Sequence, residues 1–204
     1  MIARVARNAA FSLVFCLPMP AAAESRAATE IPAPRPAPAA LTVEQSREAQ
    51  ALFGFDMAIP VIIEQAFKEQ PEYLTMSPAQ RECVLGLASP AFSSLFDSAF
   101  IELFGDSEIL GGWKAFSETP GGRIFLDSLR KTVLFKIDIG SQPDTAAAMN
   151  AMNEAERADI AAFMQSRAAG VMKKRFPDAK FSPETEKSML ARTEKECGVI
   201  LDKL

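Results

Sequence analysis

The absence of histidine from the 204-residue chain limits the chemistry that its side chains can perform. Histidine is the commonest general base near neutral pH and the commonest metal ligand, so nucleophiles that rely on histidine are excluded. One nucleophile pattern remains, because Ser128 and Lys131 have the S-x-x-K spacing and lie one helical turn apart. A catalytic lysine must be neutral, hence desolvated. We interpret the pair as polar residues of a solvated helix face, with a serine–lysine hydrolase as the alternative.

Acidic residues are numerous, but they do not follow the patterns of known acid-dependent sites. A glycosidase places two carboxyl groups across a cleft, and a calcium loop needs a dense D-x-D-x-D-G run. Most of the acids lie where helix dipoles favour them, in the first turns of predicted helices. We therefore expect no metal and no cofactor, and an acid-based envelope hydrolase stays as an alternative. The acids considered are Glu154, Glu156, Asp159, Glu184, Glu186, Glu194 and Glu196.

The stretch FSETPGGR, residues 116–123, suggests either a ligand-holding loop or a corner between two helices. A phosphate loop needs G-K-(S/T) after a strand, and neither feature is present here. In the corner interpretation, Thr119 caps the second helix and Pro120 takes its favoured first position. The alternative is an anion held at this helix start beside Arg123. We favour the structural corner.

A similar pattern returns 47 positions later in FMQSRAAG, residues 163–170. Each copy has an amphipathic helix, an aromatic residue at its end, a Ser or Thr, and then small residues that permit close helix approach. The sequence therefore predicts two similar helical corners. The residues assigned to them are Trp113, Phe116, Thr119, Pro120, Gly122, Arg123, Phe163 and Ser166.

The first corner, DSEILGGWKAFSETPGGRIFLDSL, resembles a motif of bacterial exported proteins that carry domain of unknown function 2059. A helix of the type (T/S)xxExxxxxxFYxSPxGxK is typical of that family. The resemblance covers roughly residues 80–175 and implies a helical periplasmic domain, with no catalytic residues to assign. In the second copy, Arg167 replaces the proline and Ala169 the glycine. The matching residues are Phe116, Thr119, Pro120, Gly122 and Arg123 in the first copy, and Phe163 and Ser166 in the second.

Helix-start signals recur from Thr42 to the end of the chain. Thr42, Ser77 and Asn153 each begin a capping-box pattern, and SPAF at Ser89 and SPET at Ser182 are similar starts. Apolar residues also recur at helical spacing. We predict an all-α fold for residues 42–204: an irregular bundle of stacked helical hairpins, of single-domain size, with two similar corners.

Three other segments affect the expected helix boundaries. Pro60 lies inside an apolar helical pattern and should kink or split that helix. Thr132–Ile139 alternates like a strand but has no second strand to pair with, so we interpret it as a helix end. Asp138–Ala148 is the clearest internal loop.

The N-terminus has the features of a secretory signal. Arg4 and Arg7 precede a short apolar stretch, and Ala21–Ala23 supplies small residues, so we expect cleavage after Ala23. Glu24–Leu41 is a Pro/Ala-rich segment, which we interpret as an extended spacer without core-forming residues. After cleavage, no apolar run is expected to cross a membrane.

The expected compartment is the bacterial periplasm. Loss of residues 1–23 removes two arginines and no acid, so the formal net charge changes from −4 to −6. This interspersed acidic balance argues against nucleic acid as a partner. The mature chain retains Cys83 and Cys197 on apolar helix faces, and in an oxidising compartment we predict a disulfide between them. Two buried free thiols are the alternative.

The sequence predicts a binding function more readily than a catalytic one. It has 15 Phe and 9 Met, which can form adaptable apolar grooves but can also simply fill a helical core. We expect a non-catalytic periplasmic protein that binds an envelope partner or an apolar ligand; the alternative is the envelope hydrolase. An apolar groove favours the first. Two facing carboxylates, or Lys131 buried beside Ser128, favour the second.

Overall fold

In the computed structural model, every regular element of the described residues, 39–137 and 139–201, is a helix. The predicted all-α class is therefore confirmed. The predicted signal peptide, residues 1–23, and residues 24–38 of the predicted spacer lie outside the described residues. The elements are α2 (Val43–Leu52), α3 (Phe55–Lys68), α4 (Pro71–Thr75), α5 (Pro78–Phe104), α6 (Ser107–Glu118), α7 (Pro120–Lys136), α8 (Thr145–Asn150), α9 (Glu154–Met164), the 3₁₀ helix η1 (Ala168–Lys173) and α10 (Pro183–Cys197).

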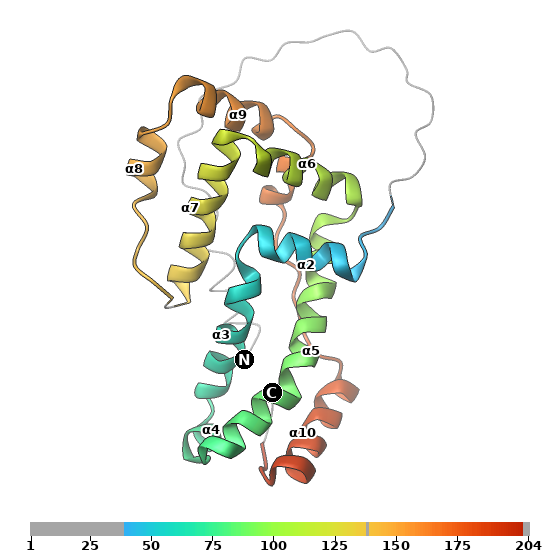
Figure 1. Ribbon diagram of the computed structural model, residues 1–204. Helices are drawn as coiled ribbons and strands as arrows, with labels where there is room; N and C mark the ends of the chain where they lie inside the picture. The colour runs from blue at the N-terminus through green and yellow to red at the C-terminus, as the bar shows by residue number, and fades with distance from the viewer. Residues whose placement is uncertain (1–38, 138, 202–204) are drawn as a thin grey trace.

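The long helix α5 is the centre of one half of the bundle, where α2, α3 and α10 pack against it (Figure 1). The other half consists of α6, α7, α9 and η1, with α8 against α7. Contacts of α2 with α6 and of α3 with α7 join the halves. A single apolar core extends through both, so the corners are held by the same core as α5.

The folded part begins slightly before the expected boundary. Leu41, predicted to belong to the spacer, is buried in the core. The carbonyl of Ala39 accepts a hydrogen bond of 3.0 Å from the backbone N–H of Ser107. The spacer thus contains one core residue, and the chain enters the fold beside the start of α6.

Most of the predicted helix starts are confirmed. Thr42, Ser77 and Asn153 each form a complete capping box, and the Ser182 hydroxyl accepts from the N–H of Thr185. Each cap supplies an acceptor to an amide that has no partner within the helix. Thr132–Ile139 contains the end of α7, as predicted. The loop predicted at Asp138–Ala148 extends too far, because α8 begins at Thr145, where the Asp144 side chain caps it.

The start predicted at Ser89 is wrong, because α5 continues through it. Pro60 likewise lies inside α3 without splitting it. Proline has no N–H, so Pro60 leaves the carbonyl of Asp56 without its helical donor, and Pro90 does the same to Gly86. All four residues are exposed. Water can bond these carbonyls, so each proline is tolerated on the outer face. The apolar face of each helix continues past the proline and favours one uninterrupted element.

Helix α5 is long and apolar, so it bears on the expectation that no segment crosses a membrane without deciding it. It has 27 residues and, within the described chain, it meets the length and composition criterion for a span. Core helices of soluble proteins meet the same criterion. Here α5 packs against α2, α3, α6 and α10, and its buried positions include Phe92, Phe96 and Phe100.

A buried carboxylate fixes α2 against α5. Asp97 accepts from the Gln50 side-chain amide at 2.8 Å and from Arg47, while its carbonyl accepts from the Ser46 hydroxyl at 2.9 Å. Such a charge is tolerated in a core because both carboxylate oxygens accept hydrogen bonds and one of them pairs with a guanidinium. These bonds determine how α2 lies, and α2 in turn supports α6.

The predicted disulfide is present and joins Cys83, near the start of α5, to Cys197 at the end of α10. Their Cα atoms are 5.7 Å apart, although 114 positions separate them in sequence. In the chain-entropy model, closing so long a loop stabilises the fold by about 4–5 kcal/mol. The bond secures α10, the last helix, to the centre of the bundle.

Candidate functional site

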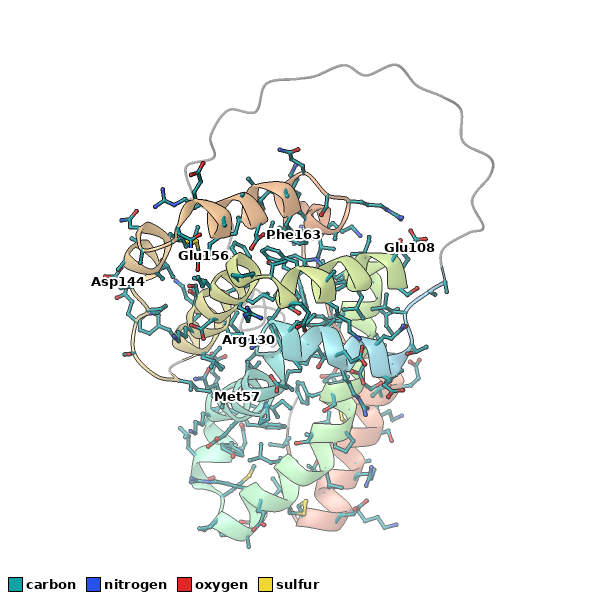
Figure 2. The ribbon with its side chains drawn as sticks, turned by 45° about the horizontal axis from the view of Figure 1, so that its top comes forward. Met57, Glu108, Arg130, Asp144, Glu156 and Phe163 are labelled. Carbon is teal, nitrogen blue, oxygen red and sulfur yellow. A yellow bond between two sulfur atoms is a disulfide. The ribbon has the colours of Figure 1, made fainter. Side chains whose placement is uncertain are left out.

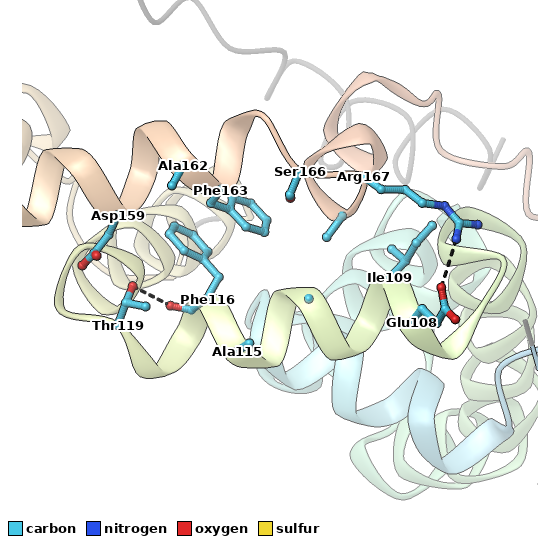
Figure 3. A pocket seen from close by; sticks show the side chains of 12 residues that line it. Glu108, Ile109, Ala115, Phe116, Thr119, Asp159, Ala162, Phe163, Ser166 and Arg167 are labelled. Atoms are coloured by element: carbon cyan, nitrogen blue, oxygen red, sulfur yellow. Dashed lines mark hydrogen bonds and ion pairs between the residues drawn. The ribbon is translucent and has the colours of Figure 1, made fainter. Parts of the chain in front are cut away.

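The two predicted corners face each other in the structure. The rings of Phe116 and Phe163 stack with centroids 3.9 Å apart and planes 5° apart (Figure 3). Both rings are buried, and Figure 2 shows Phe163 projecting from α9 toward α6. The aromatic residue that ends the first helix of one corner is therefore the packing partner of its counterpart in the other.

The packing has the exchange symmetry of a two-fold arrangement. A Cβ placed on Gly112 would lie 2.6 Å from the Cβ of Ala168, and one on Gly121 would lie 2.9 Å from the Cβ of Asp159. Adding the 47-residue offset to Gly112 gives Asp159, and adding it to Gly121 gives Ala168. Each contact is thus the counterpart of the other, as in an isologous interface.

The first turn of α7 shows why the TPGGR stretch needs no bound anion. The N–H of Gly121 donates to the Asp159 carboxylate at 3.0 Å, and the N–H of Gly122 donates to the Thr119 hydroxyl at 3.0 Å. The Arg123 N–H donates to the Thr119 carbonyl, and the Arg123 guanidinium donates to the Glu118 carbonyl. The helix start is occupied by a carboxylate of the chain itself.

The second corner repeats these bonds on a smaller scale. The Ser166 hydroxyl accepts from the N–H of Ala169 at 3.3 Å, as Thr119 does from Gly122. The Ser166 N–H donates to the Phe163 carbonyl at 2.8 Å, again as in the first corner. The next element is the six-residue η1, whereas the first corner continues into the 17-residue α7.

A groove of about 500 Å³ lies between α6 and the α9–η1 corner. Its centre is apolar and formed largely by small or aromatic residues, while charged side chains lie toward its two ends (Figure 3). This groove is the candidate functional site. It is lined by Glu108, Ile109, Gly112, Ala115, Phe116, Thr119, Asp159, Ala162, Phe163, Ser166, Arg167 and Ala168.

Trp113 contacts two of the residues that line the groove, Ala168 and Phe163. It is fully buried, and its indole N–H donates to the carbonyl of Ala168 at 2.9 Å. Its ring meets Phe163 edge-on at 4.6 Å and Phe53 at 4.8 Å. One side chain thereby joins α6 both to the second corner and to the rest of the core.

Ion pairs lie at one end of the groove. The Arg167 guanidinium is 2.5 Å from the Asp106 carboxylate and 3.3 Å from that of Glu108. Asp106 is buried and also caps α6 by accepting from the Ile109 N–H, whereas Arg167 remains 62% exposed. The bridge connects η1 to the start of α6, and its exposed cation stays accessible at the rim.

Several of these residues are not identifiable as site residues from sequence. Arg167 stands out there only as a departure from the family motif, and Asp159 only as one of many acids. Their roles depend on a partner helix 38 to 61 positions away, so no local pattern indicates them. The 47-residue repeat is the available signal, but it predicts two similar corners and not that they face each other.

The features required for the hydrolase alternative are not found at Ser128 and Lys131. The Lys131 side chain is 60% exposed and forms an ion pair of 2.6 Å with Asp127. Among residues 39–137 and 139–201, no group of acids and cysteines could hold a metal ion.

The pKa shifts of two side chains do not mark the groove either. Burial raises the pKa of the Tyr73 hydroxyl, and a hydrogen bond from Arg192 lowers the pKa of Glu196. Both residues lie outside the groove.

A scan against protein-family models, a search of curated proteins and a search of solved structures each find no match to this chain. The likeness to exported proteins with domain of unknown function 2059 therefore depends on the motif of the first corner. Function has to be inferred from the chemistry of the groove.

Proposed function

We propose that this chain is a non-catalytic periplasmic protein that binds an apolar segment of an envelope partner, or an apolar ligand, in the α6–α9 groove. The observation that carries the proposal is the apolar centre of a groove of about 500 Å³ built between the two corners. Pockets of this size and composition, with few polar groups at their edges, are typical of binding sites. The charges at the ends would orient an occupant whose middle is apolar.

Export is the second part of the proposal. The basic start, the short apolar stretch and Ala21–Ala23 support cleavage after Ala23, and the Cys83–Cys197 disulfide is compatible with an oxidising compartment. The motif shared with exported proteins of domain of unknown function 2059 points the same way. Intact-mass measurement of the protein from a periplasmic extract should give a chain that begins at Glu24. A retained Met1 would contradict this expectation.

Site-specific photo-crosslinking in the periplasm tests the binding function. A photoreactive residue in place of Ala115 or Ala162, which are exposed and line the groove from opposite sides, should capture a discrete protein or lipid. Lys187, exposed on α10 and outside the groove, is the matched control position. Adducts specific to the groove positions support the proposal. Identical products at Lys187, or no adduct at either groove position, would overturn it.

A further inference from the structure

The N-terminal segment joins the fold beside one end of the groove. Ala39 is hydrogen-bonded to Ser107, and the next two residues of α6, Glu108 and Ile109, line the groove. Leu41, two residues after Ala39, is buried in the core. Residues 31–38 are therefore tethered, through Ala39, to the start of α6.

The length of this segment suits the groove. From Ile109 to Thr119 the groove follows ten residues of α6, which is about 15 Å at the helical rise. Residues 31–38 in polyproline geometry extend about 25 Å. The segment is therefore long enough to run along the whole groove.

The composition of the segment also suits the groove. In IPAPRPAP, residues 31–38, every second residue is proline, the others are Ile31, two alanines and Arg35, and Arg35 carries the one charge. Proline-rich segments bind apolar grooves at low entropic cost because their extended conformation is preformed. In polyproline geometry Arg35, four residues before Ala39, would lie about 12 Å from it, toward the Asp159 end of the groove. Asp159 accepts from Gly121 through Oδ2, so its carboxylate can attract this cation.

We propose that residues 31–38 occupy the groove of their own chain, antiparallel to α6, and that an external partner must displace them. The inference rests on the proposed function, since it concerns the same groove. The tether keeps the segment at an effective concentration in the millimolar range, so weak contacts are sufficient. While the segment occupies the groove, no other occupant can bind there. The apparent affinity of any other occupant is therefore its intrinsic affinity multiplied by the fraction of chains whose groove is free.

Nuclear magnetic resonance of the exported chain tests this occupancy. Replacing residues 31–38 by eight Gly and Ser residues should shift the methyl signals of Ala115 and Ala162 and the indole signal of Trp113. A synthetic peptide of residues 24–39, added to this variant, should restore the original positions. Signals from α10 serve as the internal control. Unchanged groove signals, or a peptide without effect, would overturn the proposal.

A disulfide trap gives a second, independent measurement. In combination with Pro36→Cys, Ala115→Cys should form an intramolecular disulfide about tenfold faster than Lys187→Cys, because docking raises the local concentration. Equal rates at the two positions would contradict docking. Arg35→Glu should reduce the difference, and an unchanged difference would exclude pairing with Asp159.

These results are separable from the test of the proposed function. If the Gly/Ser variant still yields groove-specific photo-adducts but shows no shifts, self-occupancy fails and the binding function stands. Adducts that increase about threefold or more in the Gly/Ser variant support displacement, as expected when most grooves are occupied in cis. If the segment docks but no adduct forms in either chain, the external partner is excluded and self-occupancy stands.

Discussion

The two corners have the same local bonding but lead into elements of different length. In both, the Ser or Thr amide returns to the Phe carbonyl, and its hydroxyl accepts from the amide three residues later. The first corner then continues as α7 for 17 residues, whereas the second gives only the six residues of η1. A cap pattern thus starts a turn, but the residues after it decide the length of the helix.

The residues after each cap explain this difference. Pro120 presets the backbone for helix at the first position of α7, and apolar residues such as Phe125, Leu126 and Val133 then give it a buried face. After η1, Pro177 disfavours helical geometry at Phe176. The Phe176 ring packs against Phe55 and Phe100 in the core, so the chain follows that contact instead of continuing the helix.

The glycines reveal a second difference between the corners. A Cβ on Gly122 would collide with the carbonyl oxygen of Phe116, and one on Gly121 with that of Glu156. Their counterparts in the second corner, Ala169 and Ala168, carry a Cβ. The first corner is therefore the tighter of the two, and it depends on glycine for space and not for an unusual backbone angle.

Removing the stacked rings should have the largest effect on the paired corners. Phe116→Ala and Phe163→Ala should each lower the free energy of unfolding by about 3–5 kcal/mol, as truncation of buried aromatics does. Because the rings contact each other, the double variant should lose less than the sum of the single losses. Denaturant titration measures all three. A loss below about 1 kcal/mol at either position would indicate an exposed ring.

The glycine difference can be tested with one methyl group. Gly122→Ala should lower the free energy of unfolding by about 2–4 kcal/mol, because the backbone must shift to clear the Phe116 carbonyl. Gly111→Ala is the matched control in α6, where a Cβ meets nothing within 4 Å. It should leave stability unchanged or raise it by up to about 1 kcal/mol. Equal effects in denaturant titrations would refute the tight first corner.

Trp113→Phe should have an intermediate effect and weaken the contact between the corners. It removes the donor to the buried Ala168 carbonyl, so we expect a loss of about 1–3 kcal/mol in the free energy of unfolding. Hydrogen exchange should show faster opening of η1 than of α7. If the substitution increased the exchange rates of η1 and α7 by the same factor, the indole hydrogen bond would not stabilise the second corner specifically.

Removing the caps should give the smallest effects, and the loss of stability should be larger at the first corner than at the second. Thr119→Ala should cost about 0.5–2 kcal/mol, since Thr119 caps a long helix and its bond is 3.0 Å. Ser166→Ala should cost under about 0.5 kcal/mol, because its bond is 3.3 Å and the residue is exposed. Thermal unfolding of the two variants measures both losses. Thr119→Ser, which keeps the capping hydroxyl, is the control. The reverse order would show that the second cap is the more important.

Sequence patterns predict interactions within one helical turn better than interactions between helices. The capping boxes at Thr42, Ser77 and Asn153 are predictable because all their atoms lie within one turn. The start predicted at Ser89 fails because the buried face of α5 outweighs a local signal there. Arg167 and Asp159 are not recognisable as site residues because their partners are supplied by other helices.

The sequence by itself determined the helical class, the two corners and the cysteine pairing. Helix periodicity and caps are local, and the predicted helical domain holds two cysteines, Cys83 and Cys197, which leaves one possible pair there. Only the tertiary structure decided that Phe116 meets Phe163, that Asp159 occupies the start of α7, and that a groove lies between the corners. These features depend on which helix faces meet, and that choice is made by packing of the whole core, because no segment can bury its apolar face alone.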